Sequence, residues 1–217
     1  MDEREMSAGR IVERLFDLLR DNAVPVAIVT LALAALGTAW DYHFPDSWLS
    51  LPQNIVSGIA QYWIVRQALA REGLLAENLA GAPASFLGVS IVSGIGILLG
   101  FVLLIVPGVI LTLRWIPAIP LVLGVERLHA NDALGEAWRR TEGHWKAIGA
   151  VYLLTLVPLA GTIFAYAWEA SDTAEQLAAL GTANILANLS MVLLWTLSLA
   201  VYQGFASRTP ELEDIFA

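Results

Sequence analysis

The sequence predicts an all-α membrane protein, a polytopic helical bundle of about six transmembrane helices. Its 217 residues are 57% hydrophobic and only 15% charged, and the mean hydropathy is +0.65. A water-soluble domain is typically about 45–50% apolar and about 25% charged, and one water-soluble core cannot absorb such a surplus. The chain also divides into apolar stretches, and only every second connecting link carries Lys and Arg. These three observations favour a chain that folds in lipid.

Each apolar stretch is close to the length that a bilayer requires, about 17–25 residues. The stretches are 24–40, 52–70, 86–106, 108–124, 147–168 and 178–204. We therefore predict a cytoplasmic amphipathic segment over 1–23, a six-span membrane domain over 24–204 and a cytoplasmic tail over 205–217. The second stretch is the weakest because it carries Asn54, Gln61, Arg66 and Gln67. Its polar face requires other helices to pack against it.

The region 86–125 is too long for one span, and Pro107 and Gly108 interrupt it. Proline removes a helical hydrogen bond and glycine permits positive φ, so the pair predicts the tight turn of a helical hairpin. One long kinked helix is the alternative.

The positions of Lys and Arg distinguish these two alternatives. Eleven of the twelve lie in the N-terminal segment, at the end of the second span (Arg66) or in the link after it, in the link after the fourth span, or in the tail. The twelfth, Arg114, lies within a span, and the opposite links contain none. Positive residues mark the cytoplasmic side, so the pattern predicts six spans with both termini in the cytoplasm, and it favours the hairpin.

Two further stretches predict amphipathic surface helices. The first has an apolar stripe of Ile11, Leu15, Leu18 and Leu19. The second lies between spans four and five, after a cap at Asn131 or Asp132, and its apolar positions are Ala133, Leu134, Ala137, Trp138 and Trp145. Amphipathic helices beside spans usually lie at the level of the lipid headgroups, so anchoring is the expected role, with lipid or partner binding as the alternative.

The segment 94–146 carries an ordered set of features. A glycine-rich span runs into Pro107-Gly108, then Arg114-Trp115, Pro117, Pro120 and Glu126, and then Ala133-Leu134, Ala137-Trp138 and Gly143-His144-Trp145. This order resembles the membrane-domain family of glycerophosphoryl diester phosphodiesterases and related stand-alone bacterial membrane proteins. The resemblance implies a multi-pass protein of the bacterial inner membrane. It implies no phosphodiesterase activity, because six spans and a catalytic barrel of about 250 residues do not fit in 217 residues.

Four residues are candidates for a functional or lipid contact: Arg114, Glu126, Arg139 and Arg140. Arg114 lies six residues past the Pro-Gly pair, about 9 Å deep in a helix. A charge at that depth either contacts a lipid phosphate or substrate, or is a structural arginine bonded to helix ends. Glu126 is too far along the helix to pair with Arg114, and we expect it to bond to Arg139 or Arg140 instead.

Polar and small residues inside the spans predict helix packing. Asn184 and Asn188 lie four residues apart and are expected to hydrogen-bond across helices. Gly96 and Gly100 permit close helix approach, within the hairpin or bundle in preference to a dimer. Pro117 and Pro120 should kink the fourth span.

The sequence indicates no enzyme. It has no cysteine, its three histidines fall in separate links, and no catalytic or phosphate-binding motif is present, so we expect no metal or cofactor. No dense basic block favours nucleic acid. The preferred interpretation is a non-enzymatic envelope protein that organises membrane lipids or other membrane proteins. The alternative is a small transporter or channel that uses Arg114 and the kinked fourth span.

Overall fold

The computed structural model describes residues 6–45, 51–168 and 172–206, and the regular structure over these ranges is helical. The helices are α1 (Ala8–Asp21), α2 (Ala23–His43), α3 (Leu51–Arg71), α4 (Ala82–Leu103), α5 (Ile105–Trp115), α6 (Ala118–Leu123), α7 (Ala130–Arg140), α8 (Trp145–Thr155), α9 (Val157–Tyr166) and α10 (Thr173–Ala206). The predicted all-α fold is confirmed. The cytoplasmic tail predicted over 205–217 lies almost wholly outside the described residues.

Among the described residues, five helical segments are long and apolar enough to cross a membrane. They are α2, α4, α5 with α6, α8 with α9, and α10. The chain is therefore a multi-pass membrane protein. Helix α3 has 21 residues, which is a spanning length, but it is not one of the five, in keeping with the polar residues along it.

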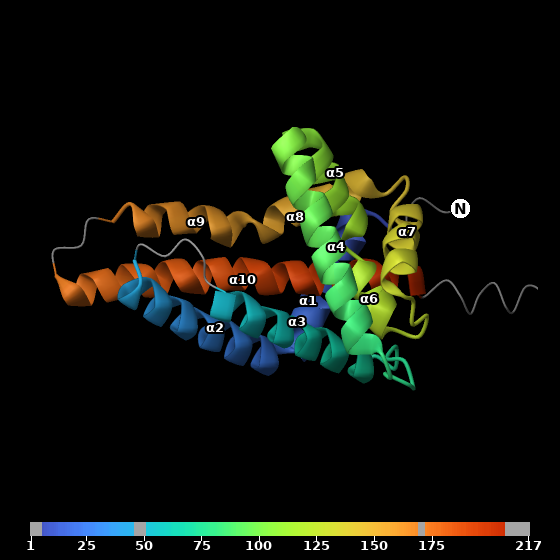
Figure 1. Ribbon diagram of the computed structural model, residues 1–217, viewed down its shortest axis with the longest axis horizontal. Helices are drawn as coiled ribbons and strands as arrows, with labels where there is room; N and C mark the ends of the chain where they lie inside the picture. Colours follow the sequence, from blue (N-terminus) through green and yellow to red (C-terminus); the bar gives the residue numbers. More distant parts are fainter. Residues whose placement is uncertain (1–5, 46–50, 169–171, 207–217) are drawn as a thin grey trace, which may run out of the picture.

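Helix α10 is the centre of the molecule. Its 34 residues extend about 51 Å, and α1, α2, α8 and α9 pack along it (Figure 1). The side-chain amide of Asn184 donates to Asp41 Oδ2 of α2 at 2.8 Å, which confirms the predicted interhelical bond. The prediction for Asn188 is wrong, because its amide donates to the Asn184 carbonyl within the same helix.

Helices α4 and α5 form the predicted hairpin, but the reversal does not lie at Pro107 and Gly108. The chain turns at Leu104, whose backbone is extended, and α5 begins at Ile105. Pro107 therefore falls in the first helical turn, where a missing N–H leaves no helical bond unmade. Gly108 and Gly100 let the backbones of α5 and α4 approach closely. A Cβ on Gly100 would lie only 2.9 Å from the Gly108 Cα. The predicted packing of Gly100 within the hairpin is thus confirmed.

The hairpin runs across the direction that α2, α9 and α10 share (Figure 1). Its tip is strongly exposed, with Val102 at 73% and Leu103 at 75% of full exposure. Helices that cross so steeply cannot all stand along one membrane normal, so the hairpin and the long helices meet the bilayer in different orientations. An apolar tip of this kind requires lipid or protein around it.

The two predicted amphipathic helices are present, but each packs its apolar stripe against the helix bundle. Ile11, Leu15 and Leu18 of α1 are buried in the core, as are Ala133, Leu134 and Ala137 of α7. The stripes therefore serve packing within the bundle, and the expected position of the two helices at the headgroups stays a prediction. The predicted cap is wrong, because α7 begins after His129 and not after Asn131 or Asp132.

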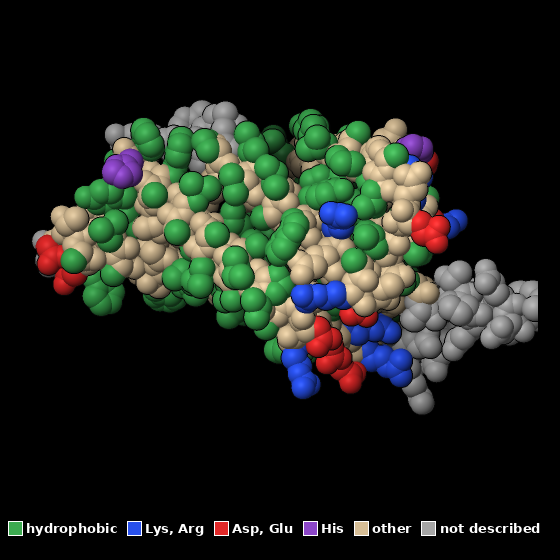
Figure 2. Space-filling model, turned by 90° about the horizontal axis from the view of Figure 1, so that it is seen from below, with side chains coloured by type: hydrophobic (Ala, Val, Ile, Leu, Met, Phe, Trp, Pro, Cys, Tyr) green, Lys and Arg blue, Asp and Glu red, His purple; other side chains and the backbone are tan. Residues whose placement is uncertain are grey.

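The basic links gather at one end of the molecule. On the face that Figure 2 shows, the Lys and Arg side chains lie together at that end and green apolar side chains cover most of the rest. Backbone carbonyls hold two of these arginines. Arg71 Nη1 donates to the Asp21 carbonyl at 2.6 Å, and Arg127 Nη2 donates to the Ala80 carbonyl at 2.5 Å.

Candidate functional site

Arg114 lies in the last turn of α5, and its side chain contacts α7. Its Nη1 donates to the Trp138 carbonyl at 3.2 Å, and its guanidinium carbon lies 4.8 Å from the centre of the Trp138 ring. The contact is a cation–π pair between the guanidinium and the Trp138 ring. The side chain stays partly exposed.

Beside Arg114 the surface of α5 is hollowed, and we call this concavity the α5 hollow. Its volume is about 380 Å³, and it is lined by Ile105, Val106, Val109, Ile110, Leu113, Arg114 and Trp145. The lining is apolar along α5 and polar only where Arg114 stands. Trp145 is 47% exposed, and Lys146 lies 5.7 Å from its ring centre. The site is therefore an apolar hollow that Arg114 and Trp145 border. Trp138 lies beside Arg114, and Lys146 lies beside Trp145.

A break in the helix directly after Arg114 fixes its position. Helix α5 ends at Trp115 and α6 begins at Ala118, with Pro117 between them, so the predicted kink is confirmed. A side-chain hydroxyl uses one of the carbonyls that the kink frees. Ser198 donates to the Ile116 carbonyl at 2.6 Å, whereas the Thr141 hydroxyl bonds the Ala137 carbonyl at 2.8 Å and lies 3.3 Å from the Arg114 carbonyl. The kink is thus a packed junction between α5, α7 and α10.

Glu126 lies in the link between α6 and α7. Arg140 Nη1 donates to its Oε1 at 2.8 Å, which confirms the predicted pair with the α7 arginines. The Tyr202 hydroxyl, fully buried on α10, donates to the other carboxylate oxygen. Because both oxygens of Glu126 are engaged, α7 is tied to the C-terminal end of α10.

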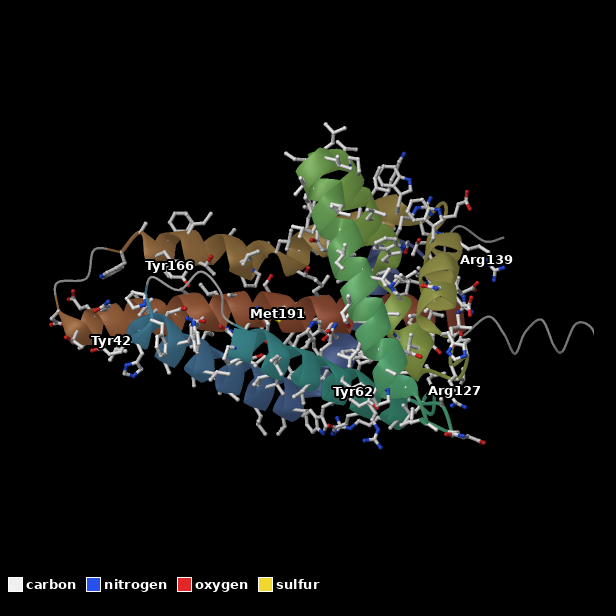
Figure 3. The ribbon with its side chains drawn as sticks, viewed as in Figure 1. Tyr42, Tyr62, Arg127, Arg139, Tyr166 and Met191 are labelled. Carbon is white, nitrogen blue, oxygen red and sulfur yellow. The ribbon has the colours of Figure 1, made fainter. Side chains whose placement is uncertain are left out.

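The other predicted arginine, Arg139, does not reach Glu126. Its guanidinium pairs with Glu136 one turn earlier on α7, and its side chain is 77% exposed. Figure 3 shows Arg139 pointing away from the body of the protein. Glu136 also accepts from Arg140 Nε at 2.5 Å, so the two α7 arginines share one carboxylate.

These ion pairs shift the pKa of two groups in α7. Burial opposes ionisation of Glu136, but the hydrogen bonds and charges of Arg140 and Arg139 outweigh it and hold the pKa of its carboxyl below the ordinary value. Burial likewise opposes the charge on Arg140. The bonds from Glu136 and Glu126 outweigh it and raise the pKa of its guanidinium. Both groups are ionised at neutral pH.

Gly124 makes the Tyr202 contact possible, because a Cβ at that position would collide with the Tyr202 hydroxyl. Sequence reasoning missed Gly124, Tyr202, Ser198 and Thr141. Gly124 had a weak signal, since it follows an apolar run at the point where a helix ends. The other three had none, because the hydroxyls of Ser198 and Tyr202 in α10, and that of Thr141 at the end of α7, give no sign of their partners in the sequence.

The structure divides the predicted residues into two groups. Arg114 faces the α5 hollow, and Pro107 and Gly108 lie in the helix that forms its wall. Glu126 and Arg140 do not line the hollow. Their ion pair helps to hold α7 against α10. Over the described residues, no group of three or more His, Asp and Glu side chains could hold a metal ion.

The chain was compared with protein-family models, with curated proteins and with solved structures, and none of them matches. The resemblance to the membrane-domain family therefore stays a prediction. The geometry of the site is what bears on function.

Proposed function

We propose that the protein binds an anionic membrane lipid in the α5 hollow and thereby organises lipid at the membrane. In this proposal an acyl chain lies along Val106, Val109 and Ile110, and the lipid phosphate meets Arg114. The observation that carries the proposal is the position of one arginine at the end of an otherwise apolar hollow of about 380 Å³. That volume is within the range of ligand-binding pockets.

The chemistry of Arg114 suits a phosphate. A guanidinium presents five N–H donors in a rigid fork that matches phosphate oxygens, and the hydrogen bond to the Trp138 carbonyl uses one nitrogen of Arg114. Tryptophan rings such as Trp138 and Trp145 suit the zone where acyl chains meet headgroups, because the ring is apolar and its N–H is polar. Lys146 adds a second positive charge beside Trp145.

The cellular setting forms part of the same proposal. The gathering of basic links at one end supports an orientation with both termini in the cytoplasm. The order of features over 94–146 supports kinship with the stand-alone relatives of the phosphodiesterase membrane domain, and so a bacterial inner membrane. We propose no catalytic step, and the partners are membrane lipids, with other membrane proteins as further candidates.

Transport through the kinked fourth span has less support. A transport site built on a broken helix uses freed backbone carbonyls to line a cavity. Here the Ile116 carbonyl accepts the hydroxyl bond of Ser198, and Ile116 is buried.

The proposal is tested by lipid retention. The full chain is purified from membranes containing phosphatidylglycerol and phosphatidylethanolamine, and bound lipid is counted by native mass spectrometry. We expect Arg114→Ala to lower phosphatidylglycerol retention about tenfold, because a charge-assisted hydrogen bond contributes about 1.5–3 kcal/mol. Arg66→Ala, which removes an exposed arginine from α3, is the control. Equal retention in both variants sinks the proposal.

A second pair of variants tests the hollow itself. Val109→Trp fills the α5 hollow, whereas Val102→Trp places the same bulk at the exposed tip of the hairpin. Loss of bound phosphatidylglycerol in Val109→Trp alone supports the acyl-chain position. Flux of solute through proteoliposomes that disappears in Arg114→Ala, with lipid retention unchanged, supports the transport alternative instead.

A further inference from the structure

A second hollow lies on the other helix of the hairpin, where α4 faces α3 and α10, and we call it the α4 hollow. Its volume is about 620 Å³. Polar residues of α3 line one wall, Asn54, Ser57 and Gln61, while α4 and α10 contribute apolar side chains that include Phe86, Leu87 and Trp195. Figure 3 labels two more lining residues, Tyr62 on α3 and Met191 on α10.

The α4 hollow carries no charge. No Asp, Glu, Lys, Arg or His is among the described residues that line it. Its polar groups are hydroxyls, amides and the indole N–H of Trp195, which form hydrogen bonds without bearing charge. A phosphate or a free ion would find no counter-charge here, and an uncharged ligand would find both donors and acceptors.

Ser57 is the observation that points to a ligand. Its side chain is 8% exposed, and its hydroxyl has no hydrogen-bond partner in the part of the chain that the structure describes. Among the described helices, Thr30 of α2 is also buried without a partner, but it does not line the hollow, and other helical hydroxyls such as those of Ser90 and Thr112 are bonded. Each of these two donates at 2.8 Å to the carbonyl four residues earlier. A buried hydroxyl without a partner is costly, and a ligand in the hollow would remove that cost.

The shape of the hollow leaves room beside Ser57. The rings of Tyr62 and Phe86 meet edge to face at 5.3 Å and join α3 to α4 at one end of the hollow. Gly58, one residue after Ser57, has open space where a Cβ would lie, with nothing within 4 Å. Because Gly58 has no side chain, the backbone of α3 borders the hollow directly at this position.

We propose that the α4 hollow binds an uncharged acylglycerol, a lipid that has ester and alcohol groups but no phosphate. The ester and alcohol oxygens meet Ser57, Asn54 and Gln61, and an acyl chain lies against Phe86, Leu87 and Trp195. Helix α3 has a polar face because this ligand, not bare hydrocarbon, covers it. The site is independent of Arg114, so it stands or falls separately from the anionic-lipid proposal.

The test is photolabelling of the full chain in phosphatidylcholine nanodiscs. The probe is a diacylglycerol that carries a photoreactive diazirine on one acyl chain, and labelled peptides are mapped by mass spectrometry. We expect labels on α3 and α4, and competition by unlabelled diacylglycerol at least tenfold more effective than competition by phosphatidic acid. Equal competition by both lipids overturns the proposal.

Two glycine variants provide the matched comparison. Gly58→Leu fills the α4 hollow, whereas Gly94→Leu adds the same side chain to α4 at a second glycine with nothing within 4 Å. We expect labelling to disappear in Gly58→Leu and to persist in Gly94→Leu and in Arg114→Ala. Persistence of the label in Gly58→Leu refutes the site.

Ser57→Ala separates ligand binding from folding. The variant removes an unpartnered hydroxyl, so the fold should keep or gain thermal stability, while diacylglycerol labelling should fall about threefold to tenfold. Unchanged labelling contradicts the role of Ser57. Because the chain has no cysteine, Gly58→Cys is a unique thiol. Efficient disulfide cross-linking between two copies at that residue would mean that a second chain covers the hollow, and would overturn the lipid assignment.

Discussion

The two helices of one hairpin border two hollows that differ mainly in charge. Both hollows are lined mostly by apolar side chains, and both open at the protein surface. The α5 hollow has the guanidinium of Arg114, whereas the polar groups of the α4 hollow, among them those of Ser57, Asn54 and Gln61, are neutral. Apolar lining gives affinity for acyl chains in either place, so the polar groups decide which lipid headgroup each accepts.

The two hollows also differ in how they are supported. Behind the α5 hollow, α7 is tied to α10 through Glu126, which accepts bonds from both Arg140 and Tyr202. Beside the α4 hollow, the Ser57 hydroxyl is unpartnered among the described residues. The bonded groups behind the α5 hollow hold α7, and with it the Trp138 contact of Arg114, in one position. In the α4 hollow, the proposed ligand would supply the hydrogen-bond partner that Ser57 lacks.

Reversing the charge at Arg114 should have the largest effect on the comparison. In Arg114→Glu, a carboxylate would repel a lipid phosphate, and we expect binding of phosphatidylglycerol to fall about 100-fold. Diacylglycerol labelling of the α4 hollow should stay unchanged. Native mass spectrometry and photolabelling measure the two effects on the same preparation. Parallel losses in both hollows would show that the sites are coupled and not separate.

Removing the support is the next largest perturbation. Glu126→Ala leaves the buried Tyr202 hydroxyl and the half-buried Arg140 without their shared partner, and we expect a loss of about 2–3 kcal/mol in unfolding free energy. Thermal unfolding in detergent micelles measures it. Arg139→Ala removes only an exposed ion pair and should cost much less. Similar losses in the two variants would contradict the structural role of Glu126.

Placing a charge in the neutral hollow sharpens the comparison. Gln61→Arg should raise retention of phosphatidylglycerol at the α4 hollow about tenfold, because a guanidinium adds a charge-assisted contact. Gln61→Met, similar in size and uncharged, is the control. The retention of phosphatidylglycerol by each variant is measured in the Arg114→Ala background, where the α5 hollow no longer contributes. A gain in Gln61→Met as well would show that charge does not decide selectivity.

The smallest effect concerns pH. The arginines of α7 hold the pKa of Glu136 below its ordinary value, so the unfolded state binds the proton more readily than the folded state. The contribution to stability is therefore fully present above the ordinary pKa of about 4.3 and is lost as the pH falls through the lowered value. Wild type should lose more thermal stability than Glu136→Gln between about pH 5 and about pH 3. Equal losses would mean that Glu136 does not contribute.

Local sequence patterns predicted the elements but not all of their junctions. The hairpin was predictable from the Pro-Gly interruption and the basic links, yet its turn lies at Leu104, because proline is tolerated in a first helical turn. The Glu126–Arg140 pair was predictable because an unpaired carboxylate beside a basic helix needs a partner. Tyr202 was not, since it lies 76 residues away in sequence and its contact exists only where α10 passes beneath Gly124.

The sequence by itself determined that the chain is helical, that it lies in a membrane and that its basic links share one end. These properties follow from composition and from periodicity within single segments. Tertiary structure alone decided that the hairpin crosses the long helices, and that α3 and α4 diverge to leave a hollow at Ser57. Such features depend on how side chains from distant segments fit together, and no pattern within one segment records that fit. The sequence shows that Arg114 is charged and lies within an apolar segment. Only the packing of the helices places it in the lining of a hollow of about 380 Å³.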